Sequence, residues 1–299
     1  MRRGEFHMFK MSRGEKIFNI VNILLLTLLC FASLYPFIYT LSISLSTAAE
    51  ANRDGFHVWP KEVTLTAYKM VFSNPNLLTG YANTLFRTIV GTVLTVIFTC
   101  LCAYPLSKKN LQHRGTFIFI IMFTMLFGGG IIPTYLLIQK VGLINSIWVY
   151  VIPMLVGAFN IILVKNFFES IPESLHESAS IDGAGEFYIL FKIYMPLSKP
   201  VLATITLWTA VTHWNAWFDA LIYVNDENKQ VLMTFLRRIV IEGSTQMMEK
   251  GIVNPDMSSF TPETIKAASV IVTILPILIF YPFVQKHFVK GIMLGGVKG

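Results

Sequence analysis

Six long apolar stretches, separated by polar segments, dominate the pattern of hydrophobic and polar positions. They lie at residues 17–44, 83–106, 116–138, 143–168, 199–224 and 266–287. Each contains about 19 or more consecutive uncharged residues, and a helix that rises 1.5 Å per residue needs about 20 to cross a hydrocarbon core about 30 Å thick. We therefore predict an all-α membrane protein with six transmembrane helices.

Glycine and proline interrupt several of these stretches. The third holds Gly128, Gly129, Gly130 and Pro133, the fourth holds Pro153 and Gly157, and the sixth holds Pro276 and Pro282. Broken backbone within a membrane is tolerated only where protein or a water-filled cavity satisfies its polar groups. We expect some spans to bend or to line a cavity, although simple kinking for packing fits each single proline as well.

Composition and charge indicate the class of protein and its orientation. Charged residues make up 14% of the chain, whereas soluble domains carry about 25%. Residues 107–115 hold three cations and no acid, and the residues after 287 hold only cations. Because cytoplasmic segments carry an excess of Lys and Arg, both termini are predicted to be cytoplasmic. The net charge of +7 therefore reflects topology, and no basic run with interleaved aromatic residues indicates nucleic-acid binding.

The segments at the ends of the spans have simple expected positions. Residues 17–44 exceed the apolar core of about 7–15 residues in a cleaved signal, so we predict an uncleaved anchor after a cytoplasmic segment, residues 1–16. Arg87 and Lys165 are expected to extend from their spans to the interface. Residues 231–243 suit a short amphipathic helix on the outer membrane face or against a partner, and a loop packed on its own spans fits equally.

The polar stretch 169–199 is predicted to be a cytoplasmic helical hairpin. Pro172 suits the first turn of a helix, and acids early in residues 173–181 favour its positive end. Asp182 and Gly183 then end this helix, because glycine readily adopts the left-handed conformation found after helix ends. The hairpin can offer a surface to a partner, although an ordinary amphipathic connector fits the same pattern.

A second helix of the hairpin is predicted over residues 186–195 and is limited by Pro196. Four apolar residues fall at helical spacing on one face, which can lie along the membrane boundary. They are Phe187, Leu190, Phe191 and Tyr194.

This hairpin resembles the cytoplasmic signature of binding-protein-dependent ABC importer permeases. That signature reads Glu-Ala-Ala, three residues, Gly, nine residues and Ile-x-Leu-Pro. Here Glu177-Ser178-Ala179, Gly183 and Ile193-Tyr194-Met195-Pro196 keep every spacing. Ser178 and Met195 stand where the family has Ala and Leu, and both changes are mild in size.

Further segments resemble the carbohydrate-uptake branch of that family, the maltose-permease type. They are Ile181-Asp182-Gly183-Ala184, Pro196-Leu197-Ser198-Lys199-Pro200, Gly129-Gly130-Ile131-Ile132-Pro133-Thr134-Tyr135, His213-Trp214-Asn215 and Gly295-Gly296-Val297-Lys298-Gly299. Within the branch the chain is similar to the polysaccharide and complex-oligosaccharide (LplC-type) permeases, over essentially its whole length.

The resemblance implies a permease subunit in the bacterial cell membrane that forms half of a carbohydrate pathway. Residues 17–299 would be a type I ABC importer transmembrane domain, with a coupling loop at about 169–199 and a cytoplasmic tail at about 288–299. The implied partners are a second homologous permease in a heterodimer, a cytoplasmic ABC ATPase dimer, an extracytoplasmic solute-binding protein, the carbohydrate and membrane lipid. The implied ATPase-coupling residues are Glu177, Ser178, Ala179, Asp182, Gly183, Ile193 and Pro196, and the tail from Gly295 would be a secondary contact.

Substrate-path candidates lie in the fifth apolar stretch. Aromatic faces stack on the apolar faces of sugar rings, and amide or carboxylate groups bind hydroxyls. A polar residue within a span is costly and usually faces a cavity or a partner. The candidates are Trp214, Asn215, His213 and Asp219, although an aromatic belt and wet headgroups account for Asp219 equally well.

The sequence favours a transport component over an enzyme. No phosphate-binding GxxxxGK[ST] loop is present, so ATP hydrolysis is assigned to a separate subunit. Cys30, Cys100 and Cys102 lack metal-ligand spacing and are expected to be small apolar residues, so no metal or cofactor is predicted. An ion-coupled secondary transporter is the alternative, but no convincing internal repeat supports it. An intramembrane enzyme would need a catalytic group that the lone His213 does not supply.

Overall fold

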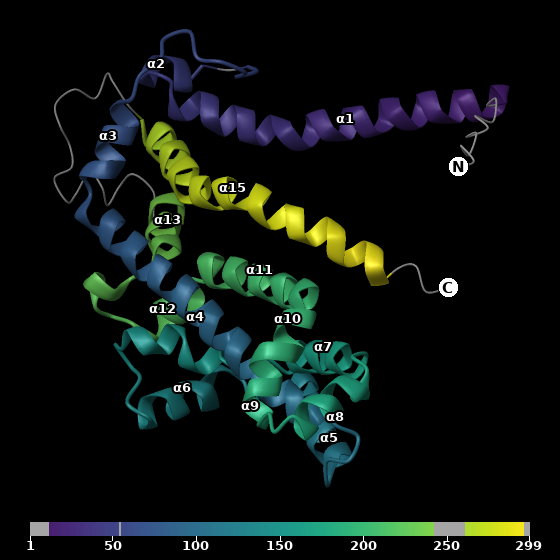
Figure 1. Ribbon diagram of the computed structural model, residues 1–299. Coiled ribbons are helices and arrows are strands. Elements are labelled where there is room, and N and C mark those ends of the chain that lie inside the picture. The colour runs from purple at the N-terminus through teal and green to yellow at the C-terminus, as the bar shows by residue number, and fades with distance from the viewer. Residues whose placement is uncertain (1–11, 54, 242–260, 296–299) are drawn as a thin grey trace. The chain divides into compact units, whose positions relative to one another are not determined.

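The computed structural model describes residues 12–53, 55–241 and 261–295 (Figure 1). Within these residues every named element is a helix, and one isolated β-bridge joins Ser46 and Val63. Three of the helices are long and apolar enough to cross a membrane: α1 (Arg13–Ser44), α4 (Pro75–Ser107) and the first part of α15 (Pro262–Gly295). Two bent pairs raise the number to five if each counts as one span. The chain divides into two compact units, described separately below.

The first unit comprises residues 1–70 and 247–271 and contains α1. A capping box begins this helix: Glu15 N–H donates to Ser12 Oγ at 3.2 Å, and Ser12 N–H donates to the Glu15 carboxylate at 2.6 Å. After α1 and the short helix α2 (Ala48–Ala51), Glu50 accepts a hydrogen bond from the Lys61 N–H at 2.7 Å. This bond is the main cause that lowers the pKa of the Glu50 carboxyl, and it fixes the loop that returns from α1.

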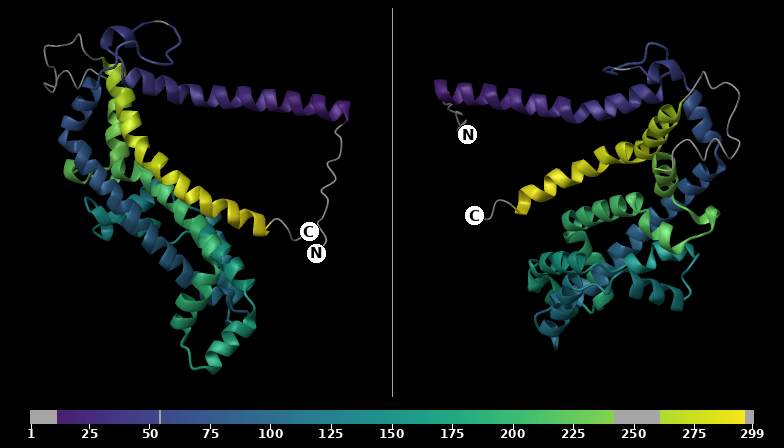
Figure 2. Two further views of the ribbon diagram at one scale, coloured as in Figure 1. Left: turned by 45° about the horizontal axis from the view of Figure 1, so that its top comes forward. Right: turned by 180° about the vertical axis from the view of Figure 1, so that it is seen from behind.

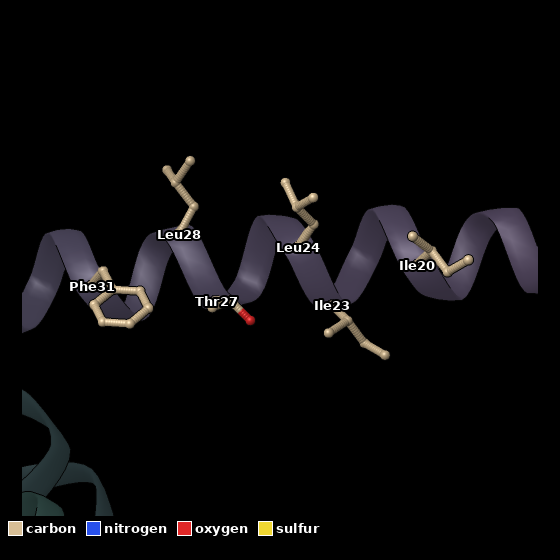
Figure 3. A pocket seen from close by; sticks show the side chains of 6 residues that line it. All are labelled: Ile20, Ile23, Leu24, Thr27, Leu28 and Phe31. Atoms are coloured by element: carbon tan, nitrogen blue, oxygen red, sulfur yellow. The ribbon is translucent and has the colours of Figure 1, made fainter.

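The side chains of α1 are mostly apolar, and they are exposed along most of the helix. Six side chains line a shallow apolar depression on this helix (Figure 3): Ile20, Ile23, Leu24, Thr27, Leu28 and Phe31. An exposed apolar helix of this length is typical of a segment surrounded by lipid chains.

The second unit comprises residues 71–246 and 272–299 and is built around α4. Helices α7 (Ala158–Glu169), α11 (Lys199–Asn215) and α13 (Leu232–Ile241) pack along α4, as Figures 1 and 2 show. Leu232 N–H donates to Thr84 Oγ1 at 2.9 Å. The amphipathic segment predicted around residues 231–243 is thus a helix over its described part, and it packs against α4.

Three predicted spans are broken at identifiable residues. Helices α5 (Arg114–Leu126) and α6 (Ile131–Lys140) meet at 114° across the glycine run, where Gly130 has a φ of 82°. The fourth stretch bends by 48° between the 3₁₀ turns of Ile147–Met154 and α7. The expected bends at glycine and proline are therefore confirmed in these two stretches. The fifth is divided into α11 and α12 (Phe218–Tyr223), a break that the sequence analysis did not predict.

Pro276 in α15 leaves one backbone carbonyl without its helical partner. A proline has no N–H, so the Val272 carbonyl four residues earlier cannot form the usual helix bond. The Tyr81 hydroxyl of α4 donates to that carbonyl, and the Trp214 indole N–H donates to the next carbonyl, that of Thr273, at 3.3 Å. Helices α4 and α11 therefore satisfy the backbone of α15 beside its proline.

Replacing Tyr81 with phenylalanine should destabilise the protein because the buried Val272 carbonyl loses its donor. An unsatisfied buried group costs about 1–3 kcal/mol, and a lower unfolding temperature of the purified protein in detergent would report this. Adding Pro276→Ala should restore the temperature, since the alanine backbone has the N–H that proline lacks and can bond to the same carbonyl. The exposed Tyr188→Phe is the matched control. An unfolding temperature that falls equally in Tyr81→Phe and in the double variant with Pro276→Ala would contradict this account.

Candidate functional site

The first half of the predicted hairpin is α8 (Glu173–Ile181), which begins after Pro172 and ends in a glycine turn. Gly183 has a φ of 83°. Its N–H donates to the Ser180 carbonyl at 3.1 Å, and the Ala184 N–H donates to the Ala179 carbonyl at 2.9 Å. These two bonds form a Schellman motif, in which the residue after the helix must be left-handed. The predicted helix end at Asp182 and Gly183 is confirmed.

The second half differs from the predicted regular helix. Helix α9 (Glu186–Ile189) runs into a π-helical turn, η3 (Leu190–Tyr194), and then into α10 (Met195–Leu197). Pro196 lies within this path, in the first turn of α10, where a missing N–H is tolerated, and the helix continues to Leu197. The prediction that Pro196 limits the helix is wrong.

The four apolar side chains of this second half differ in burial. Leu190 and Tyr194 are buried together with Ile189, whereas Phe187 and Phe191 are exposed. Phe187 and Phe191 therefore remain available to lie along the membrane boundary, and that placement stays a prediction.

The seven predicted coupling residues divide into an exposed set and an anchoring set. Ala179 and Ile193 are half-buried and pack against the core cluster formed by α4, α7 and α11. The exposed set comprises Glu177, Ser178, Asp182, Gly183 and Pro196. Ile181, beside the turn, is 86% exposed. One side of the hairpin thus packs on α4, α7 and α11, and the other side is exposed.

A polar cluster outside the predicted residues joins the two halves of the hairpin to α4. The Glu186 carboxylate of α9 accepts a hydrogen bond from the Tyr104 hydroxyl of α4 at 2.5 Å and lies 3.2 Å from His176 Nε2 of α8. Lys108 Nζ donates to the Tyr194 hydroxyl at 3.0 Å and lies 4.8 Å from the centre of the Tyr104 ring. We call Tyr104, Lys108, His176, Glu186 and Tyr194 the hairpin joint.

The electrostatics of the hairpin joint follow from these contacts. The Tyr104 hydroxyl, followed by His176 and Lys108, lowers the pKa of the Glu186 carboxyl against the opposing effect of burial. Burial lowers the pKa of the Lys108 ammonium and raises the pKa of the Tyr194 hydroxyl. Because the pKa of Glu186 is lowered, its stabilising effect is complete at neutral pH and is lost only as the pH falls through the lowered value.

Removing the Glu186 carboxylate should loosen the hairpin. Glu186→Ala leaves the Tyr104 hydroxyl and His176 without their acceptor, and hydrogen bonds to charged groups contribute about 1.5–3 kcal/mol. At pH 7, amide hydrogen exchange in residues 173–189 is expected to accelerate about tenfold or more. Glu186→Gln, which keeps one acceptor oxygen, should show a smaller change. Unchanged exchange in the alanine variant would show that the joint does not hold the hairpin.

The predicted substrate-path residues lie close together but differ in exposure. His213 is 1% exposed and packs against Gly91 of α4, and Trp214 is buried beside Tyr81 at a ring distance of 6.4 Å. Asn215 is exposed, and its side-chain amide donates to the Val211 carbonyl at 3.0 Å. Asp219 forms an ion pair, so of the four only Asn215 has an exposed side chain.

The two cations that were expected at the interface are buried and paired. Arg87 is 0% exposed, and its Nη2 lies 2.6 Å from Asp219 Oδ2. Lys165 Nζ lies 3.0 Å from the Glu169 carboxylate, which Arg114 also contacts. The interfacial position predicted for Arg87 is wrong, because its side chain is enclosed and paired with Asp219 within the protein. Lys165 reaches Glu169 at the end of α7, so its position at the interface stays a prediction. Among the described residues, no group of three or more His, Cys, Asp or Glu could hold a metal ion.

Comparison with known proteins adds the following findings. Residues 8–293 match the family described as "Binding-protein-dependent transport system inner membrane component". Protein LplC of Bacillus subtilis (strain 168) is 41% identical over 299 residues, covering 99% of this chain and 100% of that protein. The polygalacturonan/rhamnogalacturonan transport system permease protein YtcP of the same organism is 41% identical, covering 93% of this chain and 96% of that protein. A chain in the crystal structure of a bacterial ABC transporter involved in the import of the acidic polysaccharide alginate has a TM-score of 0.87 and 38% identity, covering 93% of this chain and 99% of its own length.

Proposed function

The chain belongs to the family of binding-protein-dependent transport system inner membrane components, and from this membership we propose that it is a carbohydrate permease. It is the transmembrane permease subunit of an ABC importer and is not catalytic itself. The substrate class is an oligosaccharide or a fragment of a polysaccharide. The observation that carries this choice is the full-length similarity to permeases named for polygalacturonan and alginate import.

The proposed topology has six spans with both termini in the cytoplasm. It counts each bent pair as one span and adds the broken helix formed by α11 and α12 to the three long helices. In this arrangement residues 17–299 form one transmembrane domain, and the short basic segment 107–115 lies on the same side as the hairpin. Most of the N-terminal segment 1–16 and the last four residues of the tail lie outside the described residues, so the tail contact proposed for Gly295 onward remains a prediction.

The proposed partners are a second homologous permease, an ABC ATPase dimer and an extracytoplasmic solute-binding protein. The exposed side of the hairpin, with Glu177, Asp182 and the turn at Gly183, would contact the ATPase. The Schellman turn keeps this surface rigid, and the hairpin joint connects it to α4. Movement imposed by ATP-driven closure would therefore pass from the hairpin into the spans.

Reconstitution with the partner subunits tests this function. Proteoliposomes that contain this chain, the second permease and the ATPase should take up a labelled oligosaccharide only with ATP on the side of the ATPase and with the binding protein on the opposite side. Vanadate should stop uptake. Uptake by the permeases alone, driven by an ion gradient without ATP, would replace the proposal by an ion-coupled secondary transporter.

Asn215 is the substrate-path candidate with the most direct test, because its side chain is exposed. In the same assay, Asn215→Ala is expected to reduce uptake several-fold without lowering expression, since an amide that binds sugar hydroxyls is removed. Trp214→Ala is also expected to reduce uptake, because it removes the buried indole that packs beside Tyr81 and donates to the Thr273 carbonyl. Thr206→Ala, also exposed on α11, is the matched control. Unimpaired uptake in both test variants would discard the assignment.

A further inference from the structure

The break between α11 and α12 consists of two residues without helical geometry. Ala216 has an extended backbone with φ −72° and ψ 132°, and Trp217 has φ −137° and ψ −24°. Helix α11 follows the hairpin after the single residue Ser198, so the hairpin and α11 are almost directly connected. A break of this kind would absorb movement of α11 unless its two sides were tied together.

The guanidinium group of Arg87 in α4 forms hydrogen bonds to both sides of this break. Arg87 Nη1 donates to the Ala216 carbonyl, at the end of α11, at 3.2 Å. The same atom donates to Asp219 Oδ1 at 3.2 Å, and Nη2 donates to Asp219 Oδ2 at 2.6 Å, in the first turn of α12. Asp219 Oδ1 also accepts from the Ala220 N–H at 2.9 Å. The Arg87 guanidinium therefore bonds both to the end of α11 and to the first turn of α12.

The surroundings of Arg87 hold the fork in a fixed position. Its guanidinium carbon lies 4.7 Å from the centre of the Tyr150 ring, a distance at which a cation is attracted to an aromatic face. The Tyr150 hydroxyl donates to the Lys229 carbonyl at 2.8 Å. Ala220 of α12 belongs to the same buried apolar cluster as Tyr150. Helix α12 is thus packed against the 3₁₀ turn η1 (Ile147–Tyr150) and is linked through Arg87 to α4.

A role in stability alone does not account for this pair well. Charged residues in spans are costly, and well-packed apolar residues often stabilise a site as much as a buried ion pair does. Under the proposed function, α11 receives the movement of the hairpin. The Arg87–Asp219 pair joins α11 to α12, which lies on the other side of the break. We infer that Arg87, with Asp219, is a positioning pair that makes α11 and α12 move as one lever during transport. This inference rests on the proposed function.

Neutral variants separate this coupling role from folding. The single variants Arg87→Met and Asp219→Leu each leave a buried charge without its partner, so they are expected to destabilise the protein. The double variant Arg87→Met with Asp219→Leu removes both charges and should fold and assemble with the ATPase. In proteoliposomes it is expected to keep most ATP hydrolysis but to transport at least tenfold less sugar per ATP. Arg87→Lys, a point charge without the fork, should fall between the double variant and the wild type.

A spin-label distance distinguishes failure of this inference from failure of the proposed function. Labels at the exposed positions Thr206 of α11 and Leu221 of α12 report the angle across the break without any substrate. The full complex should give one narrow distance distribution, and the neutral double variant should give a broad one. A stable double variant with the wild-type ratio of sugar to ATP and a narrow distribution would overturn the inference. A wild-type complex that transports no carbohydrate would refute the proposed function, and the distance measurement would still decide the role of Arg87.

Discussion

Replacing Gly183 with valine is expected to reduce ATP-dependent sugar uptake at least tenfold while membrane insertion is unchanged. Gly183 has a φ of 83°, and the left-handed conformation costs a residue with a side chain about 1–2 kcal/mol, with β-branched residues at the unfavourable end. A β-carbon would meet nothing within 4 Å, so the effect comes from the backbone and not from a clash. Loss of the turn would change the orientation of α8 relative to α9 and with it the surface that we propose contacts the ATPase.

The same loop offers matched controls for Gly183. Gly185→Ala changes a residue with a φ of −74° that also has open space around it, so uptake should remain near the wild-type level. Gly183→Asn should keep most of the uptake, since asparagine tolerates the left-handed conformation. Insertion is measured by protease accessibility, and ATPase binding by co-purification. Full uptake in the valine variant would show that the turn does not transmit movement.

Features that depend on neighbouring residues could be predicted from the sequence. The end of α8 at Asp182 and Gly183 is a local backbone preference, and the bends at the glycine run and near Gly157 follow from residues that break helices. The apolar length rule also located the three long helices, although α4 begins at Pro75, several residues before the predicted start. Local chemistry therefore determined the helices and the hairpin turn.

Features that depend on distant residues could not be predicted in this way. Arg87 was placed at the interface because its partner Asp219 is 132 positions away, and only the packed structure brings the two together. Tyr104 and Glu186 of the hairpin joint are 82 positions apart for the same reason. The π turn was missed for a different reason, because i, i+4 periodicity assumes a regular α-helix. For the two distant pairs, the contact in the packed structure, not the residue type, carries the information.

Replacing Gly91 with alanine is expected to disrupt the packing of α4 on α11. A β-carbon at Gly91 would lie 2.6 Å from His213 Nε2 and 2.7 Å from His213 Cε1, and the His213 ring is buried. Overpacking of this kind costs about 1–3 kcal/mol or more. This outweighs the gain of about 1 kcal/mol that alanine brings over glycine within a helix. The unfolding temperature should therefore fall, and uptake should fall with it.

The decisive result for Gly91 is whether the unfolding temperature of the Gly91→Ala variant rises or falls. Gly115→Ala, in α5 with nothing within 4 Å, should leave the unfolding temperature unchanged or raise it, since only helix propensity changes there. Gly91→Ala should lower the temperature, and adding His213→Ala should recover part of the loss because the ring that causes the clash is gone. An unfolding temperature that rises in Gly91→Ala as it does in Gly115→Ala would mean that His213 can move aside. His213 would then be a mobile side chain beside the Arg87 pair, and the close contact between α4 and α11 at Gly91 would not be needed for transport.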